Sequence, residues 1–158
     1  MKSRVVRDYP IPAGGHLWTV DAVAVSELPD GTQAVSQAEL QRIHRAVANA
    51  ICGARGVLSF EELDFLCDVT ATTYSQVADH LDLNKSTVTT WRRRGSVPSR
   101  VTSNALKRWF WFRLFGEDLA AERVPLSRFQ NDEAFLEVAA QRAIRSKVTI
   151  PVELRPAS

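Results

Sequence analysis

The clearest pattern in the chain is a series of helical hydrophobic repeats, each preceded by a residue that can cap a helix. Three segments (36–39, 59–62 and 73–76) begin with Ser or Thr and end with Glu or Gln. In such a capping box the first side chain accepts a backbone N–H and the fourth reaches back to the cap. Apolar residues recur at helical spacing behind the first box: Leu40, Ile43, Val47, Ala50 and Ile51. The pattern predicts helices that begin after residues 36, 59 and 73.

Three further helices are predicted toward the C-terminus. They are expected over residues 84–94, 99–115 and 127–145, where a capping residue precedes an apolar repeat. Gly116 is interpreted as the C-cap of the second of these helices.

The two ends of the chain have a different pattern. Residues 1–15 end in a Pro- and Gly-rich stretch and are interpreted as an irregular arm. Partly alternating apolar residues over 16–25, a turn signal at 29–31 and a short run at 32–35 predict a small β-hairpin. The tail, residues 148–154, is expected to contain a strand.

The segment from Thr73 to Trp91 has the pattern of a helix-turn-helix motif. Two short helices meet through a turn near residues 81–84, and the small Ala78 stands where they must touch. Apolar residues are available to fill the wedge behind them: Val77, Leu81, Leu83, Val88 and Trp91. Because the positions between these residues are polar, the second helix can present a hydrogen-bonding face.

This segment resembles the helix-turn-helix of the Cro/C1-type (XRE) family of bacterial and phage regulators, over about residues 59–115. The matching positions are Thr73, Val77, Ala78, Leu81, Leu83, Thr87, Val88 and Trp91. Asp82 replaces a usual Gly, Tyr74 replaces a usual Gln, and residues 92–95 replace a shorter ending. Asp tolerates the left-handed backbone expected at this turn. The resemblance implies a sequence-specific regulator that binds double-stranded DNA, expected here to repress its own gene.

Two narrower groups of regulators are also similar to this chain. A hairpin followed by a helix and this motif is similar to antitoxin-type regulators of the MqsA and HigA groups, although the cysteines of the MqsA-type zinc module are absent. The run over residues 84–94 is similar to phage activators of the CII type. The alternative function is therefore an antitoxin-type protein that mainly binds and neutralises a partner protein through its N-terminal hairpin and arm.

Together these patterns predict a mainly α fold, a helix-turn-helix helical bundle with a small N-terminal β-hairpin and a C-terminal helix plus a short strand. Three parts are expected. Residues 1–35 form the arm and hairpin, residues 36–116 the helical DNA-binding domain, and residues 117–158 a C-terminal helix and tail that provide dimerisation.

Positive charge gathers in one part of the chain. No acidic residue lies between Asp82 and Glu117. That stretch carries eight cations: Lys85, Arg92, Arg93, Arg94, Arg100, Lys107, Arg108 and Arg113. Because the whole chain has a net charge of only +2, the remainder is acidic. Such segregation is typical of a surface that faces phosphates, and a solvated basic face without a partner is the alternative.

The resemblance implies that residues 84–94 form the recognition helix in the major groove, and it assigns roles residue by residue. The side chains expected to face bases are Lys85, Ser86, Thr89 and Thr90. Those expected to contact phosphates are Ser75, Gln76, Asn84, Thr87, Arg92, Arg93, Arg94 and Arg100. Capping is an alternative role for Asn84, Thr87 and Gln76. Lys107, Arg108 and Arg113 either contribute to the same surface or lie on its far side.

An aromatic cluster is the predicted dimerisation site. Its members are Trp109, Phe110, Trp111, Phe112 and Phe115. Four consecutive aromatic residues cannot all face one interior from a single helix. We therefore expect some of them to contact a second subunit, since such regulators usually pair on a palindromic operator. The alternative is that the C-terminal helix covers them all.

Other classes of protein are not favoured by the sequence. The three histidines stand far apart without a metal-binding spacing, and no glycine-rich phosphate loop is present. No catalytic residue, metal or cofactor is expected, and the chain is interpreted as a non-enzyme. The two cysteines, Cys52 and Cys67, are expected to be reduced and mostly buried. Because the N-terminus lacks an apolar signal core and no long apolar run occurs, a cytoplasmic location is expected.

Overall fold

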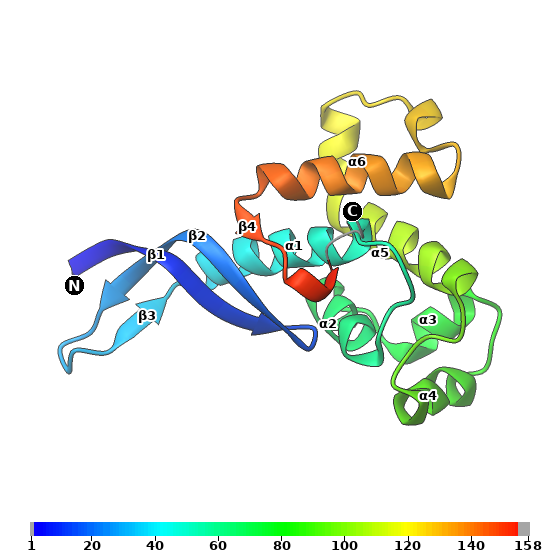
Figure 1. The fold of residues 1–158 in the computed structure, drawn as a ribbon, viewed down its shortest axis with the longest axis horizontal. Helices are drawn as coiled ribbons and strands as arrows, with labels where there is room; N and C mark the ends of the chain where they lie inside the picture. Colours follow the sequence, from blue (N-terminus) through cyan, green and yellow to red (C-terminus); the bar gives the residue numbers. More distant parts are fainter. Residues whose placement is uncertain (1, 155–158) are drawn as a thin grey trace.

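The computed structural model describes residues 2–154, apart from the side chain of Val152. It combines a long N-terminal hairpin with a body of helices (Figure 1). In chain order the elements are β1 (Lys2–Ala13), β2 (His16–Glu27), β3 (Gln33–Val35), α1 (Gln37–Gly53), α2 (Phe60–Thr70), α3 (Tyr74–His80), α4 (Lys85–Arg94), α5 (Arg100–Ala121), η1 (Leu126–Phe129), α6 (Asp132–Arg145), β4 (Val148–Thr149) and η2 (Val152–Leu154).

The expectation of a mainly α bundle is wrong, because the structure is 57% helix and 20% strand. Residues 1–15 were expected to form an irregular arm, yet β1 pairs with β2 in antiparallel register from Lys2–Glu27 to Ala13–His16. A Gly14–Gly15 turn joins the two strands, with φ of +60° and +80°. Two consecutive residues with positive φ match the right-handed twist of paired strands, and glycine adopts this conformation without a steric cost.

The expected hairpin between residues 16–25 and 32–35 is present as part of a larger sheet. β3 pairs with β2 at Val25–Val35, and β4 pairs with β2 at Thr19–Thr149. The four strands form one antiparallel sheet in which β2 contacts all three others. The C-terminal strand predicted over 148–154 is therefore confirmed only at its start, since residues 152–154 form a 3₁₀ turn.

One face of the sheet packs on the helices. The buried residues of β1 and β2 include Ile11, Trp18, Val20, Val23 and Val25. In β2 burial alternates at Trp18 and Val20 and again at Val23 and Val25, with a one-residue break between the two pairs, whereas β1 is buried only at its end, at Ile11 and Ala13. The hairpin turn lies against α1 and α2, whereas the ends of the strands near Lys2 project away from the helices (Figure 1).

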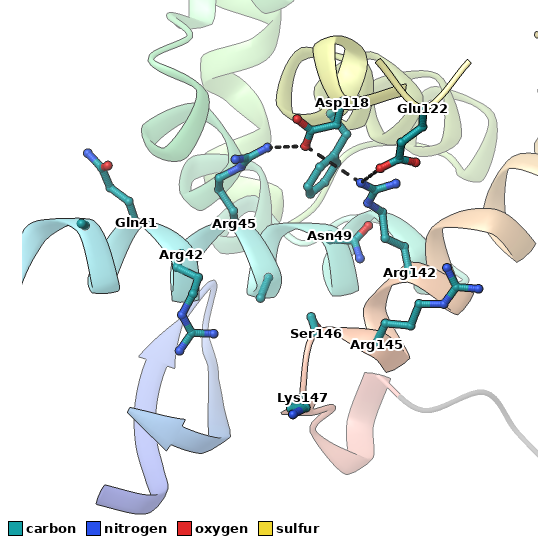
Figure 2. Close-up of a pocket in the computed structure, with 13 residues that line it drawn as sticks. Gln41, Arg42, Arg45, Asn49, Asp118, Glu122, Arg142, Arg145, Ser146 and Lys147 are labelled. Carbon is teal, nitrogen blue, oxygen red and sulfur yellow. Dashed lines mark hydrogen bonds and ion pairs between the residues drawn. The ribbon is translucent and has the colours of Figure 1, made fainter. Parts of the chain in front are cut away.

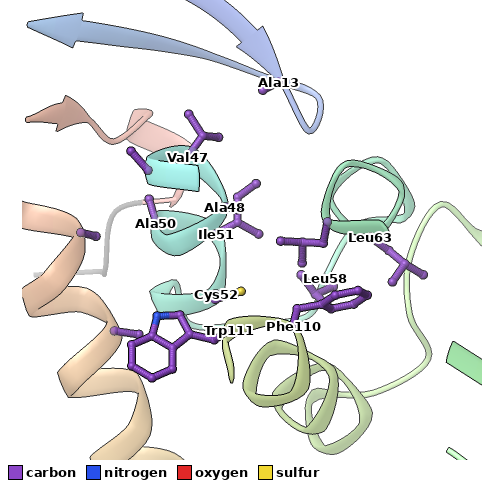
Figure 3. Packing of buried hydrophobic residues seen from close by; sticks show 14 of the residues in the cluster. Ala13, Val47, Ala48, Ala50, Ile51, Cys52, Leu58, Leu63, Phe110 and Trp111 are labelled. Atoms are coloured by element: carbon purple, nitrogen blue, oxygen red, sulfur yellow. The ribbon is translucent and has the colours of Figure 1, made fainter. Parts of the chain in front are cut away.

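Helix α1 is the central element of the core. Every residue from Ala46 to Cys52 is buried, because β2, α2, α5 and α6 all pack around this helix. Figure 3 shows Phe110 and Trp111 of α5 beside the end of α1, together with Leu58 and Leu63. Trp111 donates its indole N–H to Oδ1 of Asn49 at 2.5 Å, which satisfies two polar groups inside the core.

All three predicted helix starts are confirmed, and two of the three capping boxes are complete. Ser59–Glu62 and Thr73–Gln76 form complete capping boxes. Ser36 caps α1, but its partner Glu39 is diverted, accepting from the Ala24 backbone N–H at 3.0 Å and pairing with Arg42. These two interactions lower the pKa of Glu39. Glu39 therefore links α1 to β2 instead of bonding back to the backbone N–H of Ser36.

Two boundaries toward the C-terminus differ from the expectation. Gly116 is not a C-cap, since α5 continues through it to Ala121. The last helix does not begin at Ser127. A 3₁₀ turn occupies residues 126–129, and Asn131 caps α6 by accepting from the Ala134 N–H.

Substitution by alanine is expected to change the stability in opposite directions at two helical glycines, Gly53 and Gly116. A Cβ at Gly53 would stand 2.8 Å from the backbone nitrogen of Ala140 in α6, whereas a Cβ at Gly116 would meet no atom within 4 Å. Gly53→Ala should lower the free energy of unfolding by about 1–3 kcal/mol, because it forces α1 and α6 apart. Gly116→Ala should raise it by about 0.5–1 kcal/mol. Urea denaturation measures both, and equal signs would contradict the close approach of these helices.

Candidate nucleic-acid interface

Helices α3 and α4 meet in helix-turn-helix geometry. Val77 and Ala78 of α3 and Val88 and Trp91 of α4 are buried where the helices pack. Asp82 adopts φ +55° in the turn, the left-handed conformation expected of it. The Leu83 N–H donates to the Ala78 carbonyl at 2.8 Å and closes the turn. Leu83 itself was expected in the apolar wedge, but it is 40% exposed.

A short backbone bridge fixes the end of α4 against the start of α2. The Phe60 N–H donates to the Gly95 carbonyl at 2.9 Å, and the Val97 N–H donates to the Leu58 carbonyl at 2.9 Å. The hydroxyl of the buried Ser103 accepts the Leu58 N–H at 2.9 Å, which adds α5 to the same junction. The orientation of α4 therefore depends on two neighbouring helices as well as on α3.

The outward face of α4 is entirely polar. The four residues expected to face bases, Lys85, Ser86, Thr89 and Thr90, are all exposed. At 100° per residue, Arg93 lies on the same face, opposite the buried Val88 and Trp91. Thr89 and Thr90 donate their hydroxyls to carbonyls one turn back in the helix, so their methyl groups and hydroxyl lone pairs remain for a ligand.

Four of the residues expected to contact phosphates, Ser75, Gln76, Asn84 and Thr87, lie in α3 and at the N-terminal end of α4. Ser75 is exposed in the first turn of α3, and Asn84 stands at the N-cap of α4 without making a side-chain cap bond. The side chain of Gln76 instead accepts from the Thr73 N–H at 2.9 Å, which is the capping alternative. Thr87 is half-buried.

The other residues expected to contact phosphates are arginines at the end of α4 and at the start of α5. Arg92, Arg93, Arg94 and Arg100 are exposed. The Arg92 guanidinium lies 5.4 Å from the centre of the Phe60 ring. Three arginines in the last turn of α4 also complement the negative end of its helix dipole. These arginines therefore offset the negative helix end and leave positive charge on the exposed surface.

The remaining cations of the acid-free stretch belong to the interior or to α5. Lys107 is 2% exposed and donates to the carbonyls of Ala54 and Gly56 at 2.5 and 2.8 Å. Burial lowers the pKa of its ammonium, whereas nearby Glu62 acts in the opposite direction. Arg108 donates to the Phe129 carbonyl, and Arg113 lies over Trp109. The acid-free stretch of the sequence therefore predicted a larger basic surface than the structure has.

Tyr74, which replaces a usual Gln of the resembled family, faces inward. Its hydroxyl donates to the Asp64 carboxylate of α2. Burial, reinforced by that carboxylate, raises the pKa of Tyr74 to about 12. The hydroxyl therefore holds α3 to α2.

The aromatic residues expected at a dimer interface pack within the single chain. Phe110 and Trp111 are fully buried, and Phe115 is nearly so. The rings of Phe112 and Phe129 lie edge to face, and Trp111 contacts Phe129 and Phe135. Trp109 stacks on His80 of α3 at 4.4 Å. The C-terminal segments therefore cover Trp111 and Phe112, whereas Trp109 packs on α3 and stays partly exposed, so the alternative in which the C-terminal helix covers the whole cluster holds only in part.

Outside this surface, His16 lies between two carboxylates, that of Glu62 at 3.4 Å and that of Glu153 at 2.8 Å. Both cysteines are buried as expected, and burial raises the pKa of Cys52 and Cys67 to about 12. Among residues 2–154, no cluster of three or more His, Cys, Asp or Glu side chains could hold a metal ion. None of the helices in the described part of the chain is both long and apolar enough to cross a membrane.

The sequence reasoning missed the long hairpin, whose signal was the Gly14–Gly15 dipeptide between two runs of similar length. No protein-family model matches the chain, and neither a curated protein nor a solved structure matches it.

Two lysine substitutions test whether Lys107 belongs to the interior and Lys85 to the exposed surface. Lys107→Met should lower the free energy of unfolding by about 1–3 kcal/mol, because the carbonyls of Ala54 and Gly56 lose their donor. Lys85→Met, at an exposed position of α4, should change it by less than about 0.5 kcal/mol. Urea denaturation of both variants provides the comparison, and a neutral Lys107 variant would show that its hydrogen bonds are dispensable.

Proposed function

We propose that this protein is a sequence-specific regulator that binds double-stranded DNA through α4, and that it represses its own gene in the cytoplasm. The observation that carries the proposal is the two-sided character of α4. Its inner face is buried through Val88 and Trp91, and its outer face exposes only polar and cationic side chains. An exposed helix of this kind, held by a second helix at a turn, has the form that enters a major groove.

Residue roles follow from position on the helix. Lys85, Ser86 and Thr89 lie on the outer face in the first half of α4, the half that reaches base edges in helix-turn-helix proteins. A lysine can donate to guanine O6 or N7, and threonine can contact the thymine methyl. Arg93 shares this face one turn later and can reach either a base or a phosphate. Arg94 lies to one side and is assigned to a phosphate.

A homodimer on a two-fold operator accompanies this proposal. One module of this size reads only a few base pairs, so pairing extends the site. Because Phe110, Trp111 and Phe115 are covered by their own chain, the second subunit would use other residues.

Fluorescence anisotropy with the gene's own upstream DNA tests the proposal. The native duplex should bind at least about 10³-fold more tightly than a scrambled duplex at the same salt concentration. Lys85→Ala should weaken binding to the native duplex by about 1–3 kcal/mol and leave the scrambled duplex unaffected. Arg94→Ala should weaken both duplexes and reduce the slope of log K against log salt by about 1.

Arg128→Ala serves as the matched control, since Arg128 is an exposed cation on η1, outside α4. It should leave both the salt slope and the discrimination between duplexes unchanged. Equal and weak binding to the native and scrambled duplexes would refute sequence-specific recognition at this site.

The hairpin favours a second candidate function, the binding of a partner protein as in antitoxin-type regulators. Within residues 2–154 no strand pairs with the outer edge of β1, and Val5 and Leu17 are 59% and 64% exposed. An unpaired strand edge can accept a strand from another protein. If the DNA experiment fails, co-expression with the product of the adjacent gene tests this alternative.

A further inference from the structure

A hollow of about 700 Å³ lies away from the candidate DNA-binding surface. Its walls come from α1, from the C-terminal part of α5, and from the end of α6 with residues 146–147 (Figure 2). A volume of this size matches those of sites for small organic ligands. Figure 1 shows α4 at one end of the helical body and β4, which directly follows Lys147, near the other.

The hollow is rich in cations from segments far apart in sequence. Five of them line it: Arg42, Arg45, Arg142, Arg145 and Lys147. Two carboxylates, Asp118 and Glu122, also line it. The lining therefore has an excess of positive charge, which raises the local concentration of anions.

The two carboxylates are already engaged by two of the arginines. Arg45 pairs with Asp118 at 3.2 Å, and Arg142 pairs with Glu122 at 3.2 Å and approaches Asp118 at 3.9 Å. Arg45 also donates to the Leu114 carbonyl at 2.7 Å. These contacts hold both guanidinium groups in place, so less side-chain entropy would be lost when an anion binds.

Two other cations have no such partner. No carboxylate in residues 2–154 pairs with Arg145 or Lys147, and both side chains are exposed at the rim. Arg42 pairs with Glu39, outside the hollow, and donates to the Ala22 carbonyl at 3.2 Å. Arg145 and Lys147 therefore supply the uncompensated charge of the site.

The buried Asn49 adds a directed donor. Asn49 is 1% exposed, lines the hollow, and accepts the Trp111 indole N–H through Oδ1. Because an indole can only donate, this bond fixes which end of the amide faces Trp111. Its Nδ2 then has no hydrogen-bond acceptor among the described residues. Figure 2 shows Asn49 between Arg45 and Arg142 on the wall of the hollow.

The ring of Phe115 is the largest apolar group of the lining, beside Ala38 and Ala46. The guanidinium groups of Arg45 and Arg142 lie 5.1 and 5.0 Å from its centre. The site thus combines an apolar surface, two fixed guanidinium groups, an amide donor and two free cations. Guanidinium groups bind carboxylate and phosphate oxygens through paired hydrogen bonds.

We propose that this hollow is a binding site for a small organic anion that carries two or more oxyanion groups, carboxylate or phosphate. Arg145 and Lys147 attract the ligand, Arg45 and Arg142 bind its oxygens, and Asn49 donates to it at the wall. The proposal does not depend on DNA binding, because none of these residues belongs to α3 or α4.

Isothermal titration calorimetry with citrate and with inorganic pyrophosphate tests the site, and sodium chloride at matched ionic strength controls for general screening. Wild-type protein should bind at least one of the two anions with a Kd below about 1 mM. Binding of citrate alone would assign the site to carboxylates, and binding of pyrophosphate alone would assign it to phosphates. No binding of either anion overturns the proposal.

The double variant Arg145→Gln/Lys147→Gln should weaken binding at least about tenfold, as expected from the loss of charged donors. Arg4→Gln/Arg7→Gln removes the same charge from exposed positions on β1 and should change the Kd less than about twofold. Unfolding temperatures without ligand establish that both variants are folded. Equal weakening by the two double variants would reduce the effect to net charge and overturn the site.

Discussion

The arrangement of this protein depends on one turn of α5, the aromatic residues 109–112, whose side chains fix three neighbouring segments at once. Trp109 stacks on His80 and so anchors the helix-turn-helix, and Trp111 bonds the buried Asn49 of α1. Phe112 packs on Phe129, which positions the segment before α6. Because successive residues of a helix point about 100° apart, four large side chains in one turn must meet different elements. The aromatic run therefore acts as the internal junction of a single chain.

Local signals explain why the helix-turn-helix could be predicted from the sequence. The boxes at Ser59 and Thr73 are closed by residues three positions away, and the left-handed Asp82 follows from the turn itself. Such short-range interactions are written in consecutive residues and need no knowledge of the tertiary fold. The candidate base-facing residues were found for the same reason, since their exposure follows from the burial of Val88 and Trp91 on one helix.

The failures concern features that tertiary contacts decide. Pro10 and Pro12 made β1 look irregular, yet a proline is accepted in an edge strand, where its missing N–H faces no partner strand. Lys107 looked like surface charge, but two carbonyls at the end of α1 bind it inside the core. Glu39 does not complete its predicted capping box, because its carboxylate accepts the Ala24 N–H of β2 instead. The sequence around Ser36 could not reveal this contact, since Ala24 belongs to another element.

The same limit applies to charge and leads to the second cationic surface. None of the five cations in the hollow belongs to the acid-free stretch, because they come from α1 and from the end of α6. Only the packing of α1 against α5 and α6 assembles them around Phe115. Helix α5 runs from one surface to the other. It begins at Arg100, shortly after the candidate recognition helix α4, and Asp118 near its C-terminal end lines the hollow. Since Arg45 and Arg142 both bind Asp118, an anion that competes for these guanidinium groups would act on the end of α5. Two sets of contacts lie between that end of α5 and α4: the aromatic turn, where Trp109 stacks on His80 of α3, and the junction of Leu58, Phe60 and Ser103 with the residues that follow α4.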